Sequence, residues 1–225
     1  MILQKSFIDT DEIVQYMADY LISSLKENNR VLWLLSGGSN IAIEVKTMDK
    51  IPDALTKKLI IGLIDERYGN FNHADSNFYQ IKSANFNFRD SAIIEVIEKQ
   101  SDSIKSSAKE YGQKITELLS NKNIFSIGQL GVGDDGHIAG ILPDCSIIES
   151  PETVDSYTSK PFNRISFTPN GLGLLDQIIV VIVDTRKNHL IDKIFLDDGN
   201  DEKELPIKLL HRYNSVNIYN INNRG

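Results

Sequence analysis

One segment of the chain gathers an imidazole and two carboxylates in a glycine-rich turn: residues 131–143, Gly-Val-Gly-Asp-Asp-Gly-His-Ile-Ala-Gly-Ile-Leu-Pro. The turn follows the apolar run 124–130, which is typical of a strand. Its glycines allow a sharp bend and a close approach of the backbone to a ligand. A histidine beside an aspartate at a strand end is a common way to build a general base, so His137 is a candidate base and Asp135 a candidate to orient it. The plainer alternative is a solvated histidine on a glycine turn.

A second glycine turn, Ser-Gly-Gly-Ser-Asn at 36–40, follows the apolar run 31–35 and precedes a helix predicted from about Ile41. Exposed N–H groups at the start of a helix, with two hydroxyls beside them, favour binding of a phosphate. The candidate phosphate-binding residues are therefore Ser36, Gly37, Gly38 and Ser39. A plain strand-to-helix turn is the alternative interpretation.

Two acids and a guanidinium end a third apolar run, 59–64, as Asp65-Glu66-Arg67. Arg67 could hold or stabilise an oxyanion, and Asp65 could orient it or act as a base. The alternative is a solvated rim that caps the next helix, and Asp75-Ser76-Asn77 shortly afterwards is a candidate helix N-cap.

Basic residues lie at the ends of two later strands: Arg164 opens one and Lys187 follows another. Each is a candidate phosphate ligand, although charged residues at strand ends are commonly just solvated. The remaining histidines have no acidic or glycine context and are interpreted as surface or capping residues: His73, His189 and His211. The spacing typical of a zinc site does not occur, and we expect neither a metal nor a cofactor.

The formal net charge of −7 argues against nucleic acid or an anionic membrane as the main partner, because both attract a basic face. It leaves room for a small anionic substrate held by a local cationic cluster. No apolar run approaches the roughly 18 residues of a membrane span, and no signal peptide is visible. Cys145 is the only cysteine, which favours a reducing compartment. We expect a soluble cytoplasmic protein with a single domain over residues 1–225; its oligomeric state stays open.

Apolar strand patterns alternate with helical patterns along the chain. Candidate N-caps at 9–11 precede a helix whose apolar residues recur every four positions: Ile13, Met17, Leu21 and Leu25. Strands are predicted at 31–35, 59–64, 92–97, 124–130, 164–168, 177–183 and 216–221, and further helices at about 101–120, 186–196 and 205–213. This alternation predicts an α/β fold: a mostly parallel, doubly wound open sheet with helices on both faces.

The predicted fold constrains where a site can lie. Ligands of open parallel sheets bind beyond the carboxyl ends of the strands. The loops 36–40, 65–69 and 131–137 all follow such ends, so we expect them to converge although they are far apart in sequence.

Taken together, these segments resemble the 6-phosphogluconolactonases, which share a Rossmann-like fold group with the glucosamine-6-phosphate deaminases. The family pattern has a Ser-Gly-Gly-Ser turn, an Asp-Glu-Arg segment leading to Ser-Asn, and Gly-x-Gly-x-Asp-Gly-His-x-Ala before a proline. Here these stand at 36–39, at 65–67 with 76–77, and at 131–143. The resemblance covers most of the chain, from about residue 30 to 190.

The chain departs from the family pattern at three places. Asn40-Ile41 replaces Thr-Pro, residues 140–142 read Gly-Ile-Leu instead of Ser-Leu-Phe, and Gly69 stands where a valine is expected. The changes at residues 40–41 and at Gly69 leave the chemical groups in place. They bear on affinity or family branch rather than on reaction class.

The resemblance implies hydrolysis of 6-phosphoglucono-δ-lactone in the oxidative pentose phosphate pathway. It assigns His137 as the base that activates water, Asp135 as its orienting partner, and Arg67 as the residue that stabilises the oxyanion or holds the lactone. The turn 36–39, with Arg164 and Lys187, would bind the phosphate.

Two alternatives stay open. The deaminases share the Asp-Gly-His-Ile-Ala core but carry a glutamate where this chain has Leu142, and a tyrosine where it has Arg67. A sugar-phosphate-binding module without catalysis is the other alternative, and the intact His137 and Arg67 argue against it.

Overall fold

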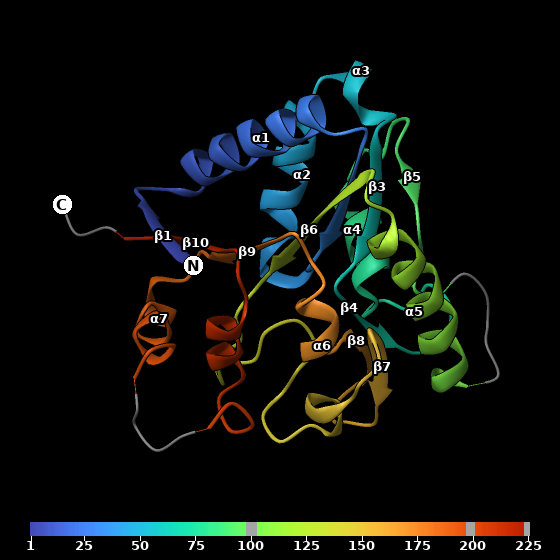
Figure 1. Cartoon of the computed structure of the whole chain (residues 1–225), viewed down its shortest axis with the longest axis vertical. Helices are drawn as coiled ribbons and strands as arrows, with labels where there is room; N and C mark the ends of the chain where they lie inside the picture. Colours follow the sequence, from blue (N-terminus) through green and yellow to red (C-terminus); the bar gives the residue numbers. More distant parts are fainter. Residues whose placement is uncertain (98–102, 197–200, 223–225) are drawn as a thin grey trace.

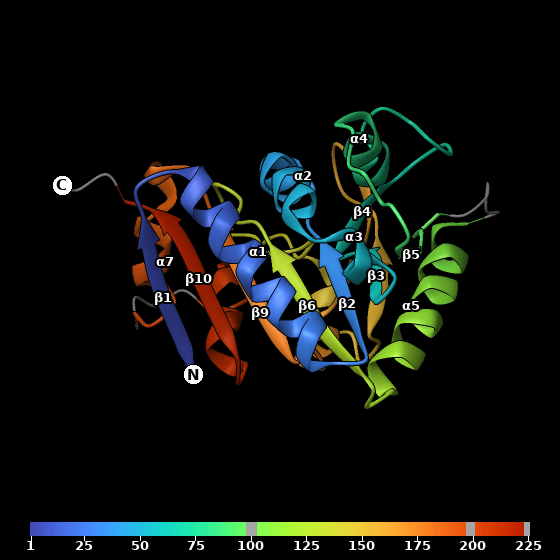
Figure 2. The same ribbon diagram turned by 90° about the horizontal axis from the view of Figure 1, so that it is seen from above.

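All neighbouring strands in the larger of two sheets run parallel, in the order β1-β10-β9-β6-β2-β3-β5. The structure is a computed structural model and describes residues 1–97, 103–196 and 201–222. Figure 2 shows these strands side by side, from β1 on the left to β5 on the right. Their bounds are Ile2–Phe7 (β1), Arg30–Leu35 (β2), Leu59–Leu63 (β3), Ala92–Ile93 (β5), Ile124–Leu130 (β6), Gln177–Ile182 (β9) and Val216–Ile221 (β10).

A smaller antiparallel sheet of three strands has the order β4-β8-β7. Its strands are Asp65–Tyr68 (β4), Val154–Tyr157 (β7) and Asn163–Phe167 (β8). The chain passes from one sheet to the other at Ile64, whose N–H donates to Leu35 of the large sheet and whose carbonyl accepts from Phe167 of the small one. The two sheets therefore meet where β3 ends.

Helices cover both faces of the parallel sheet. In Figure 1, α1 and α2 lie above the sheet, and α6 and α7 lie below it. The α-helices are Thr10–Glu27 (α1), Ile41–Lys50 (α2), Asp53–Thr56 (α3), Asn77–Ser83 (α4), Ile104–Ser120 (α5), Pro169–Leu172 (α6) and His189–Lys193 (α7). Short 3-10 helices occupy Gly38–Asn40, Ser146–Glu149, Thr185–Lys187 and Pro206–Arg212. The predicted α/β fold with a mostly parallel sheet is confirmed.

The helix predicted after residues 9–11 forms as α1. The Asp9 side chain accepts a hydrogen bond from the Glu12 N–H at 3.0 Å and so caps the first turn. The residues at four-residue spacing are all fully buried: Ile13, Met17, Leu21 and Leu25. Burying each such side chain contributes about 1.5–3 kcal/mol, so the apolar stripe fixes α1 on the sheet.

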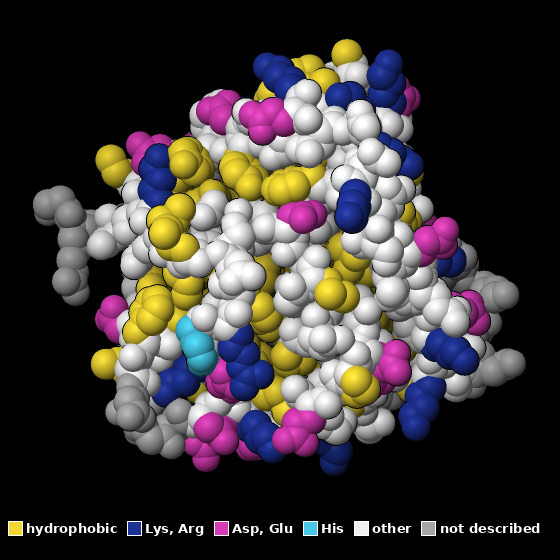
Figure 3. All heavy atoms as spheres, in the orientation of Figure 1, with side chains coloured by type: hydrophobic (Ala, Val, Ile, Leu, Met, Phe, Trp, Pro, Cys, Tyr) yellow, Lys and Arg dark blue, Asp and Glu magenta, His cyan; other side chains and the backbone are white. Residues whose placement is uncertain are grey.

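Among the described residues no helix is both long enough and apolar enough to cross a bilayer. On the face shown in Figure 3, hydrophobic side chains gather over β1 and beside α1. The exposed apolar residues in and between these elements include Leu3, Ile8 and Tyr16. Lys5 Nζ lies 3.7 Å from the centre of the Tyr16 ring, so a charged side chain covers part of this surface.

Several elements differ from their predicted form. The strand predicted at 92–97 is only Ala92–Ile93, and the strand predicted at 164–168 lies in the small sheet. The helix predicted at 205–213 is a 3-10 helix, and that at 186–196 is divided into two short helices. The helix predicted at about 101–120 is described from Ile104, and residues 101–102 lie outside the described part.

The neighbouring strands β2 and β6 are the point where the order of the parallel sheet changes direction. From β2 the chain goes on to β3 on one side, and from β6 it goes on to β9 on the other. The loops that follow these two strands diverge, which opens a crevice at the carboxyl ends. This is the position expected for a ligand site.

Candidate active site

A cavity of about 270 Å³ lies at this crevice, beyond the ends of β2, β3, β6 and β9. Its walls contain nine of the ten residues singled out in the sequence: Ser36, Gly37, Gly38, Ser39, Asp65, Arg67, His137, Arg164 and Lys187. The tenth, Asp135, hydrogen-bonds to His137. The structure thus brings together groups that are up to 151 positions apart along the chain, from Ser36 to Lys187.

His137 is held by its own loop. Its Nδ1 lies 2.6 Å from Asp135 Oδ1, and the same carboxylate oxygen accepts the His137 N–H at 3.1 Å. The hydrogen bond from His137 lowers the pKa of Asp135 to about 2, so this carboxylate is ionised at neutral pH. An ionised partner at Nδ1 favours the tautomer with hydrogen on Nδ1. This leaves Nε2 as the nitrogen free to accept a proton.

Two glycines make this loop geometry possible. A Cβ on Gly133 would lie 2.1 Å from His137 Nδ1, so a side chain there would displace the imidazole. Gly136 has a φ of 77°, a left-handed conformation that favours glycine. Its carbonyl accepts the Ile207 N–H at 2.9 Å, which joins the loop to the C-terminal 3-10 helix.

The turn after β2 is fixed from beneath by Glu44 of α2. Glu44 Oε1 accepts from the Ser36 N–H at 2.8 Å, the Ser36 hydroxyl at 3.1 Å and the Gly37 N–H at 3.3 Å. Gly37 has a φ of 72°, and a Cβ there would come within 2.9 Å of the Asn77 side chain. The N–H groups of Ser36 and Gly37 therefore already donate to a group of the protein. Gly38 and Ser39 are the exposed part of the turn.

Asn40, one of the departures from the family pattern, links two loops of the site. It is fully buried, and its side-chain N–H₂ donates to Ser36 Oγ at 3.1 Å and to the Leu130 carbonyl at 3.2 Å. Leu130 ends β6, just before the loop that carries His137. The asparagine therefore ties the glycine turn to the start of the histidine loop.

The small sheet places two arginines opposite each other. In the antiparallel register Arg67 of β4 faces Arg164 of β8, and Asp65 faces Ser166. Like charges directly across a sheet repel each other, so an anion between them would be bound favourably. Asp65 compensates part of the charge, since its Oδ2 lies 3.3 Å from Arg164 Nη1 with both side chains mostly buried.

The same surroundings act on the protonation of Asp65. Burial raises the pKa of Asp65, and the nearby Arg164, His137 and Arg67 oppose this rise. The two arginines therefore favour the charged form of this carboxylate, against the cost of its burial.

Arg67 is positioned by groups on either side. Its guanidinium lies 5.2 Å from the centre of the Phe162 ring, and its Nη1 donates to the Asp75 carbonyl at 3.4 Å. His73 Nε2 hydrogen-bonds to the Arg67 carbonyl at 2.8 Å. A Cβ on Gly69 would lie 2.9 Å from the His73 ring, which explains why glycine stands here in place of the expected valine.

Glu66 does not face the cavity but caps α4, as one of the alternative interpretations of this segment supposed. Its carboxylate accepts from the N–H groups of Asn77 and Phe78 and from the Ser76 hydroxyl. Ser76 is the N-cap of α4, so that prediction is confirmed.

Asn77 is a cavity residue that the residue-by-residue interpretation missed. It donates to the Asp65 carbonyl at 3.0 Å, and within the described part of the chain its buried Oδ1 has no hydrogen-bond partner. The Ser-Asn of the family pattern was the signal that could have identified it.

Lys187 reaches the cavity from the loop after β9. Its Nζ donates to the Val132 carbonyl at 2.7 Å and lies 3.1 Å from Asp134 Oδ1. The lysine side chain is 19% exposed, while that of Asp134 is 88% exposed. The solvated aspartate neutralises little of the ammonium charge on the cavity side.

The other candidate groups lie outside the cavity walls. Cys145 is buried, and burial raises the pKa of its thiol, which disfavours a nucleophilic thiolate. Within the described ranges no three His, Cys, Asp or Glu side chains gather as a metal-binding set. His189 and His211 contact main-chain carbonyls near helix ends, at Arg186 and Lys208.

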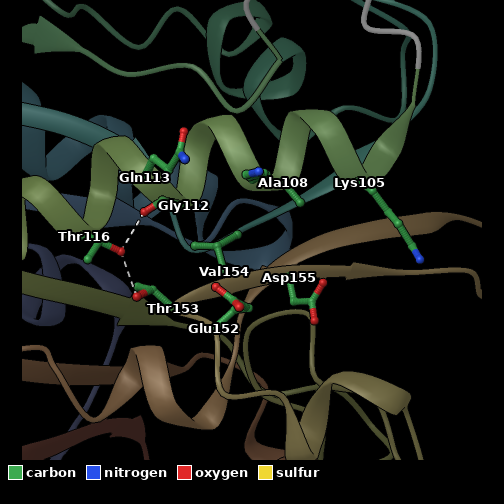
Figure 4. Close-up of a pocket in the computed structure, with 10 residues that line it drawn as sticks. Lys105, Ala108, Gly112, Gln113, Thr116, Glu152, Thr153, Val154 and Asp155 are labelled. Atoms are coloured by element: carbon green, nitrogen blue, oxygen red, sulfur yellow. Dashed lines mark hydrogen bonds between the residues drawn. The ribbon is translucent and has the colours of Figure 1, made fainter.

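A second and larger hollow, of about 590 Å³, lies between α5 and β7. Figure 4 shows the Thr116 hydroxyl donating to the Gly112 carbonyl within α5 and hydrogen-bonded to the Thr153 hydroxyl across this hollow. Its charged residues, which include Lys105, Glu152 and Asp155, are of both signs, and none of the predicted site residues lines it. Volume alone therefore does not mark the functional site.

Comparison with known proteins places the chain among sugar-phosphate enzymes. The profile of the family described as glucosamine-6-phosphate isomerases/6-phosphogluconolactonase matches residues 9–218. "Probable 6-phosphogluconolactonase 1" of Arabidopsis thaliana is 27% identical over an alignment that covers 92% of this chain and 85% of that protein. The 6-phosphogluconolactonase of Chlamydia pneumoniae is 24% identical, with 84% and 74% covered.

Solved structures share the fold. The 6-phosphogluconolactonase of Shewanella baltica superposes with a TM-score of 0.83 at 19% identity, covering 99% of this chain and 98% of that one. A monomeric glucosamine-6-phosphate deaminase superposes with a TM-score of 0.79 at 18% identity, covering 99% and 97%. The fold is thus common to both activities and does not separate them. The matched profile does settle the family: the chain belongs to the glucosamine-6-phosphate isomerase/6-phosphogluconolactonase family.

Proposed function

We propose that this protein is a 6-phosphogluconolactonase, which hydrolyses 6-phosphoglucono-δ-lactone to 6-phosphogluconate in the oxidative pentose phosphate pathway. The observation that carries the proposal is His137, whose Nδ1 is bound by Asp135 while the ring lines a cavity that also contains Arg67, Arg164 and Lys187. A base with one free nitrogen, surrounded by cations, suits an anionic ester. The names of the relatives point to the same substrate.

In this mechanism His137 Nε2 accepts a proton from water as the water oxygen attacks the lactone carbonyl. Arg67 stabilises the tetrahedral oxyanion. The intermediate collapses with cleavage of the ring C–O bond, and the imidazolium returns its proton to the departing ring oxygen. A positioned base contributes roughly 10²–10⁴-fold to the rate. A single oxyanion donor contributes about 3 kcal/mol.

We assign the phosphate to the part of the cavity formed by the glycine turn, Arg164 and Lys187. The exposed end of the glycine turn, Gly38 and Ser39, presents main-chain N–H groups and a hydroxyl, and Arg164 and Lys187 supply positive charge. Ser36 and Gly37 shape this subsite rather than contact the ligand, because Glu44 occupies their N–H groups. Asp65 holds Arg164 in place through the 3.3 Å ion pair.

Deamination of glucosamine 6-phosphate is the competing reaction in this family. The corresponding loop of the deaminases carries a glutamate at the position of Leu142. In this chain the Leu142 side chain packs against the hydrophobic core. Arg67 also takes the place of the tyrosine of the deaminases. The chain therefore lacks a carboxylate that the deaminases have, and this favours the lactonase.

The direct test assays the purified protein with three substrates: the phosphorylated lactone, plain gluconolactone, and glucosamine 6-phosphate. We expect hydrolysis of the phosphorylated lactone well above its spontaneous rate, and little activity on the other two. Ammonia release from glucosamine 6-phosphate at a comparable rate would replace lactonase by deaminase. Absence of both activities, with retained binding of 6-phosphogluconate, would indicate a binding module.

A further inference from the structure

A buried carboxylate lies directly beneath the turn that we assign to the phosphate. Glu44 is fully buried, and its Oε1 accepts all three of its hydrogen bonds, two from main-chain N–H groups and one from the Ser36 hydroxyl. Its second oxygen, Oε2, is also buried and has no hydrogen-bond partner among the described residues. The function proposed above makes no use of this side chain's charge.

We propose that Glu44 is a positioning residue of the phosphate-binding turn, and that its carboxylate takes up a proton when a phosphate group binds at Gly38 and Ser39. The inference rests on the proposed function for the location of the phosphate. It adds that binding is linked to pH through a residue that does not contact the ligand.

The hydrogen bonds account for the positioning. Three donors converge on one oxygen and hold Ser36 and Gly37, so the N–H groups next along the chain are oriented by the same contacts. Gly37 has a φ of 72°, which glycine adopts without strain, and its N–H donates to the same Glu44 oxygen. A glutamine at residue 44 would keep an oxygen acceptor for the three donors, remove the charge and place an N–H₂ group at the position of Oε2.

The surroundings account for the proton. Burial raises the pKa of Glu44 to about 7 although the hydrogen bonds from Ser36 and Gly37 lower it, and the charge of Asp65 raises it further. The charged pair between α2 and α1, Lys46 with Asp11, lies on the exposed side of these helices, with side chains 54% and 77% exposed. A carboxylate whose pKa lies near neutral pH takes up a proton when another anion binds close to it, because the second negative charge raises that pKa further.

Titration calorimetry with 6-phosphogluconate, at pH 7 in two buffers of different ionisation enthalpy, measures the protons taken up on binding. We expect the wild type to take up about half a proton more than Glu44→Gln, because a group whose pKa equals the pH is half protonated. Glu44→Gln should bind roughly fivefold more tightly than the wild type at pH 8. Glu117→Gln on the exposed face of α5 is the matched control, with the same change of charge away from the cavity.

Sulfate is the second probe, because it does not change its own charge near neutral pH. Its affinity for the wild type should fall as the pH rises through 7, and this measurement needs no variant. Equal proton uptake by the wild type and Glu44→Gln, or a sulfate affinity independent of pH, would overturn the inference. So would failure of both anions to bind. Proton-linked binding without lactone hydrolysis would instead leave the role of Glu44 standing and remove the proposed function.

Discussion

The two sheets supply the cavity in different ways. The parallel sheet contributes the turns after β2 and β6, and with the second turn His137. The three-stranded sheet contributes side chains from facing strands, Arg67 and Arg164. The parallel sheet thus positions the base, His137, and the small sheet positions the two guanidinium groups, Arg67 and Arg164. A loop set by glycines can place a catalytic group against a backbone turn, whereas facing strands can hold two like charges ready for an anion.

The largest expected effect is on the side of the parallel sheet. His137→Ala should lower kcat by roughly 10²–10⁴-fold with the fold intact, since it removes the base. Steady-state kinetics, corrected for spontaneous hydrolysis, measures this loss. Near wild-type kcat in a folded variant would make the histidine positional, and Asp65 or Asp135 the next candidate base.

On the side of the small sheet, Arg164→Ala should raise KM roughly 10- to 100-fold, as expected for losing a charge-assisted hydrogen bond of about 1.5–3 kcal/mol. Its kcat should change much less than that of His137→Ala. The effect should disappear with plain gluconolactone, which has no phosphate for Arg164 to bind. If kcat/KM were the same for the phosphorylated and plain lactones in the wild type, the phosphate assignment would be wrong.

A smaller effect concerns the support of Arg67. Gly69→Val should destabilise the protein by about 1–3 kcal/mol through overpacking, because its side chain would meet the His73 ring. In a His73→Ala background the same change should cost much less. Denaturant unfolding of the four proteins gives this double-mutant cycle. Additive costs would show that His73 does not explain the glycine.

A further effect on stability, which depends on pH, is the one contributed through Glu44. Its pKa is about 7 in the folded protein against an ordinary value of 4.5, so stability present at low pH is lost as the pH rises through this window. Glu44→Gln should therefore raise Tm by roughly 5 °C at pH 8 and leave it unchanged at pH 4. Thermal unfolding at the two pH values provides the check, and an equal shift at both would assign the effect to packing.

Much of the parallel sheet could be predicted because its strands are buried on both faces. Buried strands such as Arg30–Leu35 and Gln177–Ile182 stand out as continuous apolar runs. Their carboxyl ends located the turns at 36–39 and 131–137, so the convergence of these turns followed from the order of elements. Arg164 reaches the site through the small sheet instead.

The sequence predicts a strand at 164–168, but neither its pairing into the small sheet nor the edge strand β1 could be predicted, for physical reasons. β4 is Asp-Glu-Arg-Tyr, which has no apolar pattern, and its partner β8 lies about a hundred residues later. β1 is mostly exposed and is defined by pairing with β10 at the other end of the chain. Glu44 likewise looks like an ordinary helical glutamate until the turn closes over it. The two strands depend on pairing partners distant in sequence, whereas Glu44 depends on how the turn at 36–37 folds.

The most direct test of the central claim, that His137 is the general base, is chemical rescue of His137→Ala by imidazole. Removing the side chain leaves space beside Gly133 for a free imidazole ring. We predict that the variant's kcat rises with imidazole concentration and follows the neutral form of imidazole, after subtraction of the reaction of imidazole with lactone alone. A rate unchanged by imidazole, in a folded variant that binds 6-phosphogluconate, would contradict the assignment.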